Sequence, residues 1–111
     1  NHEMPDSYGH AKDFFDKNLK DGQFNKRRNL FQYSNPSESR PKEGDLLIFD
    51  KTIFNSHGHV AIVSKVMKNK IEIIQQNPGP LGKSREVFRL RKERDKWRID
   101  GGKVLGWLRR G

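Results

Sequence analysis

Two strand-like segments joined by a short polar turn constrain the fold of this chain more than any other feature. The first segment, residues 58–66, is rich in β-branched side chains, and the second, residues 71–77, begins Ile-Glu-Ile-Ile. Residues 68–70, Lys-Asn-Lys, provide the polar turn between them. Runs of this length and composition on either side of such a turn predict a β-hairpin, and a hairpin is the smallest unit of an antiparallel sheet.

Other apolar runs predict more strands and one helix. Short strands are expected at residues 46–49, 87–90, 97–99 and 104–108. The helix is expected near the N-terminus, where four apolar residues fall at helical spacing after a capping residue, Ser7: Ala11, Phe14, Phe15 and Leu19. Residues 23–41 contain many Asn, Ser and Pro and predict a loop that Leu30, Phe31 and Tyr33 anchor to the core.

The order of these elements indicates the fold class. One helix followed by strands with no helix between them predicts an α+β fold with an antiparallel sheet rather than βαβ units. A chain of 111 residues fits one domain. We assign that domain to residues 8–111 and treat the polar residues 1–7 as a disordered segment or linker. No apolar run approaches the ~20 residues of a membrane-spanning helix, so no membrane span is predicted.

His59 lies at the start of the first hairpin strand, and Gln75 and Asn77 lie at the end of the second. Antiparallel pairing brings these strand ends together, and the alternation of side chains lets all three residues share one face. A histidine that acts as a general base needs its second ring nitrogen hydrogen-bonded to a fixed acceptor. The amide oxygen of Gln75 or of Asn77 can be that acceptor, although His59 in a purely packing role fits the spacing as well.

The composition excludes several kinds of site. The chain has no cysteine, which rules out disulfides, thiolate zinc sites and a cysteine nucleophile within these residues. His57 and His59 could face the same way, but His2 and His10 are far away in the sequence and no carboxylate has a supporting spacing. We therefore predict no metal site and no cofactor.

The net charge is +9, and residues 83–98 contain eight basic residues against three acidic ones, Glu86, Glu93 and Asp95. A run of basic residues there could bind nucleic acid or another anionic polymer, or it could be a solvated pair of charged strands. We favour the solvated strands because aromatic side chains are sparse, and we do not expect nucleic acid as a partner. The basic residues are Lys83, Arg85, Arg89, Arg91, Lys92, Arg94, Lys96 and Arg98.

Three motifs in combination resemble a known family. Residues 41–50 (Pro-Lys-Glu-Gly-Asp-Leu-Leu-Ile-Phe-Asp), 58–63 (Gly-His-Val-Ala-Ile-Val) and 71–77 (Ile-Glu-Ile-Ile-Gln-Gln-Asn) look like the C-terminal two-thirds of a CHAP domain. CHAP domains are cysteine- and histidine-dependent amidohydrolases or peptidases of the papain-like and NlpC/P60 group. The most similar variety is the amidase domain of glutathionylspermidine synthetase/amidase, which also shares the Val-Leu-Gly-Trp of residues 104–107 and the basic stretch at 84–90. The resemblance covers about residues 8–109 and implies a papain-like fold whose N-terminal helix precedes a barrel-like sheet.

The resemblance also implies roles for single residues. His59 matches the catalytic histidine of the family, and Gln75 matches the position that orients it. The amidase group carries glutamate at that position, so Gln75 is a departure: it can accept a hydrogen bond but cannot stabilise an imidazolium by charge. Asn77 is a second candidate for the orienting residue.

The family's nucleophile has no counterpart in this sequence. In one alignment the cysteine lies upstream of Asn1 and the segment at Ala11 follows the cysteine helix. In the other, residues 8–11 are the nucleophile turn and His10 replaces the cysteine. We favour the first alignment because the distance from Ala11 to the turn at Gly44 fits it better.

The resemblance implies a hydrolase that cleaves amide bonds in a glutathionylspermidine-like substrate or in a peptidoglycan peptide. The chain would be inactive without its cysteine, and a surface left by the missing helix could form a dimer. Such a protein would be cytoplasmic if it cleaves glutathionylspermidine, and secreted or periplasmic if it acts on the cell wall. The alternative is a degenerate CHAP-like module that binds an anionic polymer or a protein through its basic surface.

Overall fold

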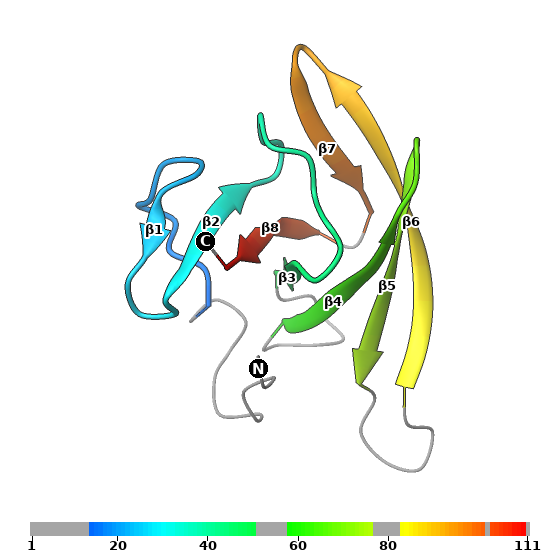
Figure 1. Cartoon of the computed structure of the whole chain (residues 1–111), viewed down its shortest axis with the longest axis horizontal. Helices are drawn as coiled ribbons and strands as arrows, with labels where there is room; N and C mark the ends of the chain where they lie inside the picture. Colours follow the sequence, from blue (N-terminus) through cyan, green and yellow to red (C-terminus); the bar gives the residue numbers. More distant parts are fainter. Residues whose placement is uncertain (1–13, 51–57, 77–82, 102, 111) are drawn as a thin grey trace.

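The computed structural model describes residues 14–50, 58–76, 83–101 and 103–110. In these residues eight strands form one antiparallel sheet, and there is no helix (Figure 1). Residues 14–110, within these ranges, contain no helix long and apolar enough to cross a membrane. The strands are β1 (Phe24–Asn25), β2 (Leu30–Ser34), β3 (Leu46–Phe49), β4 (His59–Val66), β5 (Lys70–Gln76), β6 (Lys83–Glu93), β7 (Lys96–Asp100) and β8 (Val104–Arg109).

The spatial order of the strands is β1-β2-β8-β3-β4-β5-β6-β7. The last strand, β8, is therefore inserted between β2 and β3, and Figure 1 shows it there in red beside the cyan β2. The predicted hairpin is confirmed as β4 and β5, which pair antiparallel. A β-bulge between Val63 and Lys65 keeps Ile71 and Ile73 of β5 on the same face as Val63 and Val66 of β4.

The predicted α+β fold with a barrel-like sheet is wrong, because the described residues form one open sheet with no helix. Of the expected helix, Ala11 lies outside the described residues, and residues 14–19 form turns and irregular backbone. Side chains of the sheet take the backbone groups that a helix would pair. Gln32 accepts from the backbone N–H of Asp16 (2.9 Å) and donates to its carbonyl (2.8 Å), while Asn25 donates to the carbonyl of Phe14 (3.2 Å).

The loop predicted at residues 23–41 is also partly wrong, because it contains β1 and β2. Leu30 and Gln32 alternate as buried residues along β2, and the strand pairs with β8 from Phe31 opposite Arg109 to Ser34 opposite Gly106. The partner strand lies more than 70 residues further along the chain. Pairing of this kind stabilises a strand whose Asn-, Ser- and Pro-rich surroundings favour a loop.

The sheet buries hydrophobic side chains on both faces. One face carries a large cluster that includes Phe49, Ala61, Ile73 and Trp107, and the other carries a smaller one formed by Phe14, Leu30, Leu46, Ile48 and Leu108. Strand β3 contributes to both clusters, and all four of its residues are buried. Strand β3 pairs with β4 on one side and with β8 on the other, and its pairing with β4 places His59 opposite Phe49 of the larger cluster.

Candidate active site around His59

The His59 ring lies flat against the ring of Phe49. The two residues are paired across β3 and β4, and their rings are 4.2 Å apart between centroids with planes inclined by 8°. Phe49 is buried in the large hydrophobic cluster, whereas His59 is only half-buried. The stacking fixes the plane of the imidazole and covers one of its faces. The ring nitrogens lie on the edge of the ring, where hydrogen-bond partners can reach them.

Gln75 of β5 lies on the same face of the sheet as His59, and a hydrogen bond between the two side chains acts on the pKa of the imidazole. The amide nitrogen of Gln75 donates to Oε1 of Glu86 on β6 (3.0 Å), which leaves the amide oxygen to accept from the imidazole. The structure therefore brings two of the sequence-predicted site residues, His59 and Gln75, into contact. Asn77, the second candidate for the orienting residue, lies outside the described residues, as do His2, His10 and His57.

The surroundings of His59 favour its neutral form. Burial lowers the pKa of His59 below its ordinary value of 6.5, while the hydrogen bond to Gln75 and the charge of Glu86 oppose that shift without cancelling it. At neutral pH the ring therefore carries one proton and one free lone pair. This is the state in which an imidazole can accept a proton from a nucleophile.

Two neighbours of His59 were not foreseen from the sequence. Phe49 was predicted only as part of an apolar strand, and Glu86 only as one of the acids within the basic run. Their place beside the histidine depends on the registers of β3 with β4 and of β5 with β6. Nothing in the local sequence signals these registers, although the predicted strand at residues 46–49 was a suitable starting point for finding Phe49.

In the part of the chain that the structure describes, three of the eight cations of the basic run form ion pairs with carboxylates: Arg85, Arg91 and Arg98. Arg91 contacts both Asp100 (2.8 Å) and Glu93 (2.6 Å), and Arg98 lies 3.4 Å from Glu93. On the other side of β6, Arg85 contacts Glu72 of β5 (2.7 Å). These pairs agree with the interpretation of the basic run as a solvated pair of charged strands. Among the described residues, no three potential metal ligands come together.

Comparison with known proteins adds one finding. The sequence matches the family model described as CHAP domain over residues 2–77. The match includes both His59 and Gln75 and ends before β6, so Glu86 and the last three strands lie beyond it. A comparison with curated proteins gives no match.

Proposed function

Since this chain belongs to the CHAP domain family, whose members are cysteine- and histidine-dependent amidases or peptidases, we propose that it provides the histidine of such an active site. His59 is the general base, and Gln75 holds its ring. The observation that carries the proposal is the contact between these two residues, with the imidazole stacked on Phe49 and kept neutral by burial. An oriented, neutral imidazole is what a thiol nucleophile requires as its base.

In the proposed reaction the free nitrogen of His59 takes the proton of a thiol, and the thiolate attacks the amide carbonyl carbon. The resulting imidazolium then gives its proton to the amine as the carbon–nitrogen bond breaks, leaving a thioester. Water, deprotonated by His59, hydrolyses the thioester and releases the acid and the thiol. The 111 residues contain no cysteine, so the thiol has to come from outside them, and we expect these residues alone to be inactive.

For the substrate we propose an amide of a peptide with a polyamine, as in glutathionylspermidine, or a peptide of the cell wall. Support comes from the Val-Leu-Gly-Trp stretch, which lies in β8 beyond the family match and resembles the glutathionylspermidine amidases. Parallel assays with glutathionylspermidine and with peptidoglycan fragments separate the two substrates.

The proposal is tested with the natural gene product and the variant His59→Ala. We expect amide hydrolysis to fall by about 100-fold or more, because general-base catalysis contributes roughly 10²–10⁴-fold. Lys65→Ala is a suitable control, since Lys65 is exposed toward the other end of the same strand. Alkylation with iodoacetamide should also abolish the activity. Full hydrolysis by His59→Ala, or by the alkylated protein, would show that the proposal is wrong.

A second candidate is a binding module without catalysis, which the lack of a cysteine and the net charge of +9 favour. In that case the chain should bind an anionic polymer such as heparin, with an affinity that falls steeply as salt is added. The ion pairs on β6 and β7 argue against a strong effect, because they neutralise part of the basic run.

A further inference from the structure

Three polar side chains form a row across three neighbouring strands. His59 on β4 contacts Gln75 on β5, and Gln75 contacts Glu86 on β6. In the pairing of β5 with β6, Gln75 is opposite Ser84 and Glu86 is opposite Ile73. Gln75 and Glu86 are therefore diagonal neighbours on one face of the sheet, a separation that long side chains span.

The carboxylate of Glu86 determines which end of the Gln75 amide faces the histidine. An amide group has a donor end and an acceptor end of nearly the same shape, whereas an ionised carboxylate only accepts. Because Glu86 Oε1 accepts from Nε2 of Gln75 at 3.0 Å, the amide oxygen is directed away from Glu86 and toward the imidazole. Without Glu86 the amide could rotate and present its NH₂ group, which cannot accept the N–H of His59.

Glu86 also supplies the charge that Gln75 lacks. An amide can orient an imidazole but cannot balance the positive charge that forms when the ring takes up a proton. Glu86 acts on His59 electrostatically, and its charge favours the imidazolium. The other side chains with a described contact to His59 are uncharged: Phe49 from β3 and Gln75 from β5.

We propose that Glu86 is a positioning residue of this site, which fixes the amide of Gln75 and balances the imidazolium of His59 through it. Its catalytic consequence rests on the proposed function, but its effect on His59 does not. In the amidases that this chain resembles, a glutamate occupies the orienting position that Gln75 holds on β5. In this chain the carboxylate, that of Glu86, lies one strand further along the sheet, on β6. Glu86 lies beyond residues 2–77, so the family match does not include it.

The first test is an NMR titration of the His59 ring in the unmodified chain and in Glu86→Gln. The variant keeps an oxygen that can accept from Gln75 but removes the charge, so the pKa of His59 should fall. Glu43→Gln is the matched control, because it removes a charge from another exposed glutamate. Glu43 precedes Gly44, whose backbone N–H donates to the carbonyl of Val63, and Val63 lies four residues along β4 from His59. At roughly 3.3 Å per residue this is beyond the screening length of about 8 Å at physiological salt. Its His59 titration should match that of the unmodified chain.

A double variant tests positioning separately from fold. Gln75→Glu combined with Glu86→Gln exchanges the amide and the carboxylate, and should bring the pKa of His59 back to or above that of the unmodified chain. If Glu86→Gln leaves the titration of His59 unchanged, or if the exchange fails to restore it, Glu86 has no such role. Glu86 is exposed, so thermal unfolding should confirm that both variants remain folded.

Activity gives the last measurement. In the natural gene product, Glu86→Gln should lower kcat by on the order of 10- to 100-fold with KM unchanged, as loss of an outer partner of a histidine does at metal sites. An unchanged kcat would overturn the catalytic part of the inference. If the titration shifts as expected but His59→Ala remains fully active, the proposed function fails while the link from Glu86 to His59 stands.

Discussion

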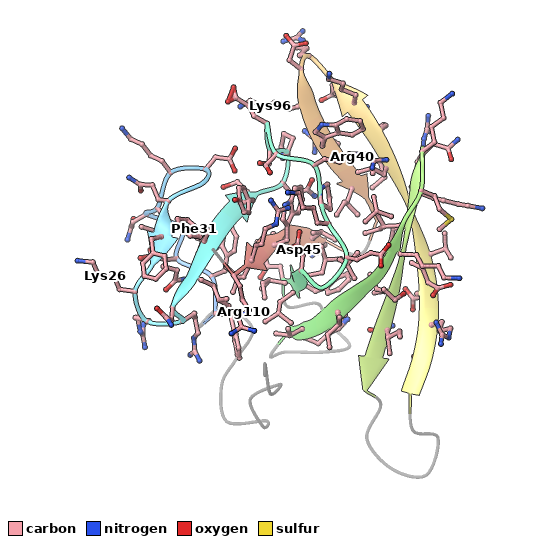
Figure 2. The ribbon with its side chains drawn as sticks, in the orientation of Figure 1. Lys26, Phe31, Arg40, Asp45, Lys96 and Arg110 are labelled. Carbon is pink, nitrogen blue, oxygen red and sulfur yellow. The ribbon has the colours of Figure 1, made fainter. Side chains whose placement is uncertain are left out.

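Arg109 of β8 holds the carboxylate of Asp45 with two hydrogen bonds, from Nε to Oδ1 (2.9 Å) and from Nη2 to Oδ2 (2.8 Å). Asp45 is 1% exposed and lies near the centre of the molecule (Figure 2), and the side chain of Arg109 is 16% exposed. Asp45 also accepts from the backbone N–H of Lys42, and Arg109 stacks over the ring of Tyr33 at 4.5 Å. Arg109, which lies beyond the family match, thus stabilises the turn before β3, which lies within the match.

Replacing Arg109 by alanine should destabilise the fold strongly. The change leaves the Asp45 carboxylate buried without its cation, which typically costs about 3–5 kcal/mol. Urea unfolding followed by circular dichroism measures the loss. Arg110→Ala is the control, because Arg110 follows Arg109 in the sequence and its side chain is exposed. This variant should change the unfolding free energy by less than ~0.5 kcal/mol. Equal effects of the two variants would contradict a special role for the Asp45–Arg109 pair.

Gly106 should not tolerate even a methyl group. A Cβ at this position would overlap the carbonyl oxygen of Tyr33 and lie 2.5 Å from Cε1 of Phe15. Since β8 is paired on both sides, with β2 and with β3, the backbone cannot move away without breaking a ladder. We expect Gly106→Ala to lose about 3 kcal/mol or more of unfolding free energy, at the upper end of overpacking costs.

Gly44→Ala separates this steric effect from ordinary backbone strain. Gly44 has a φ of 90°, but no atom lies within 4 Å of the place where a Cβ would be. Its cost should therefore be only about 1–2 kcal/mol, from the left-handed conformation alone. A thermal melt of the two alanine variants side by side makes the comparison. A smaller loss for Gly106→Ala than for Gly44→Ala would mean that the close approach of β2 and β8 is not rigid.

The parts of the fold that were predictable are those encoded by neighbouring residues. The β4–β5 hairpin and the strand at β3 follow from short apolar runs and a polar turn, and their sequence positions sufficed to propose His59 with Gln75. The insertion of β8 between β2 and β3 was not predictable, because pairing between distant segments leaves no local pattern. Glu86 was missed for the same reason.

The wrong helix has a more specific cause. Apolar residues at helical spacing, such as Phe15 and Leu19, indicate a helix only if the backbone has no better partners. Here Gln32 and Asn25, both buried, pair with the backbone of Asp16 and Phe14. In addition, Asp16 Oδ1 accepts from the N–H of Asn18 (2.9 Å), a local bond that competes with helix formation. Both buried amides lie in a segment that the sequence had indicated as loop.

Stability should depend on pH through His59. Burial holds the pKa of folded His59 below the value of 6.5 expected when the chain is unfolded. At pH values between these two pKa values, the unfolded chain binds more protons than the folded chain. The contribution of His59 to stability is therefore fully present above pH ~6.5 and is lost as the pH falls through the folded pKa. The unfolding free energy of the unmodified chain, minus that of His59→Gln, should therefore decrease from pH 7.5 to pH 5. A flat difference would show that folding leaves the pKa of His59 unaltered.

The stacking partner of His59 should control this pKa. In Phe49→Leu a smaller side chain replaces the ring that covers one face of the imidazole, so water reaches His59 more readily and its pKa should rise toward the ordinary value. NMR titration of the His59 ring measures the change. Phe88→Leu is the matched control, because Phe88 packs against the same cluster, with its ring 5.7 Å from that of Phe49. If both variants shift the pKa of His59 equally, general loosening of the core is responsible, and the stacked pair has no separate influence on the proton affinity of the imidazole.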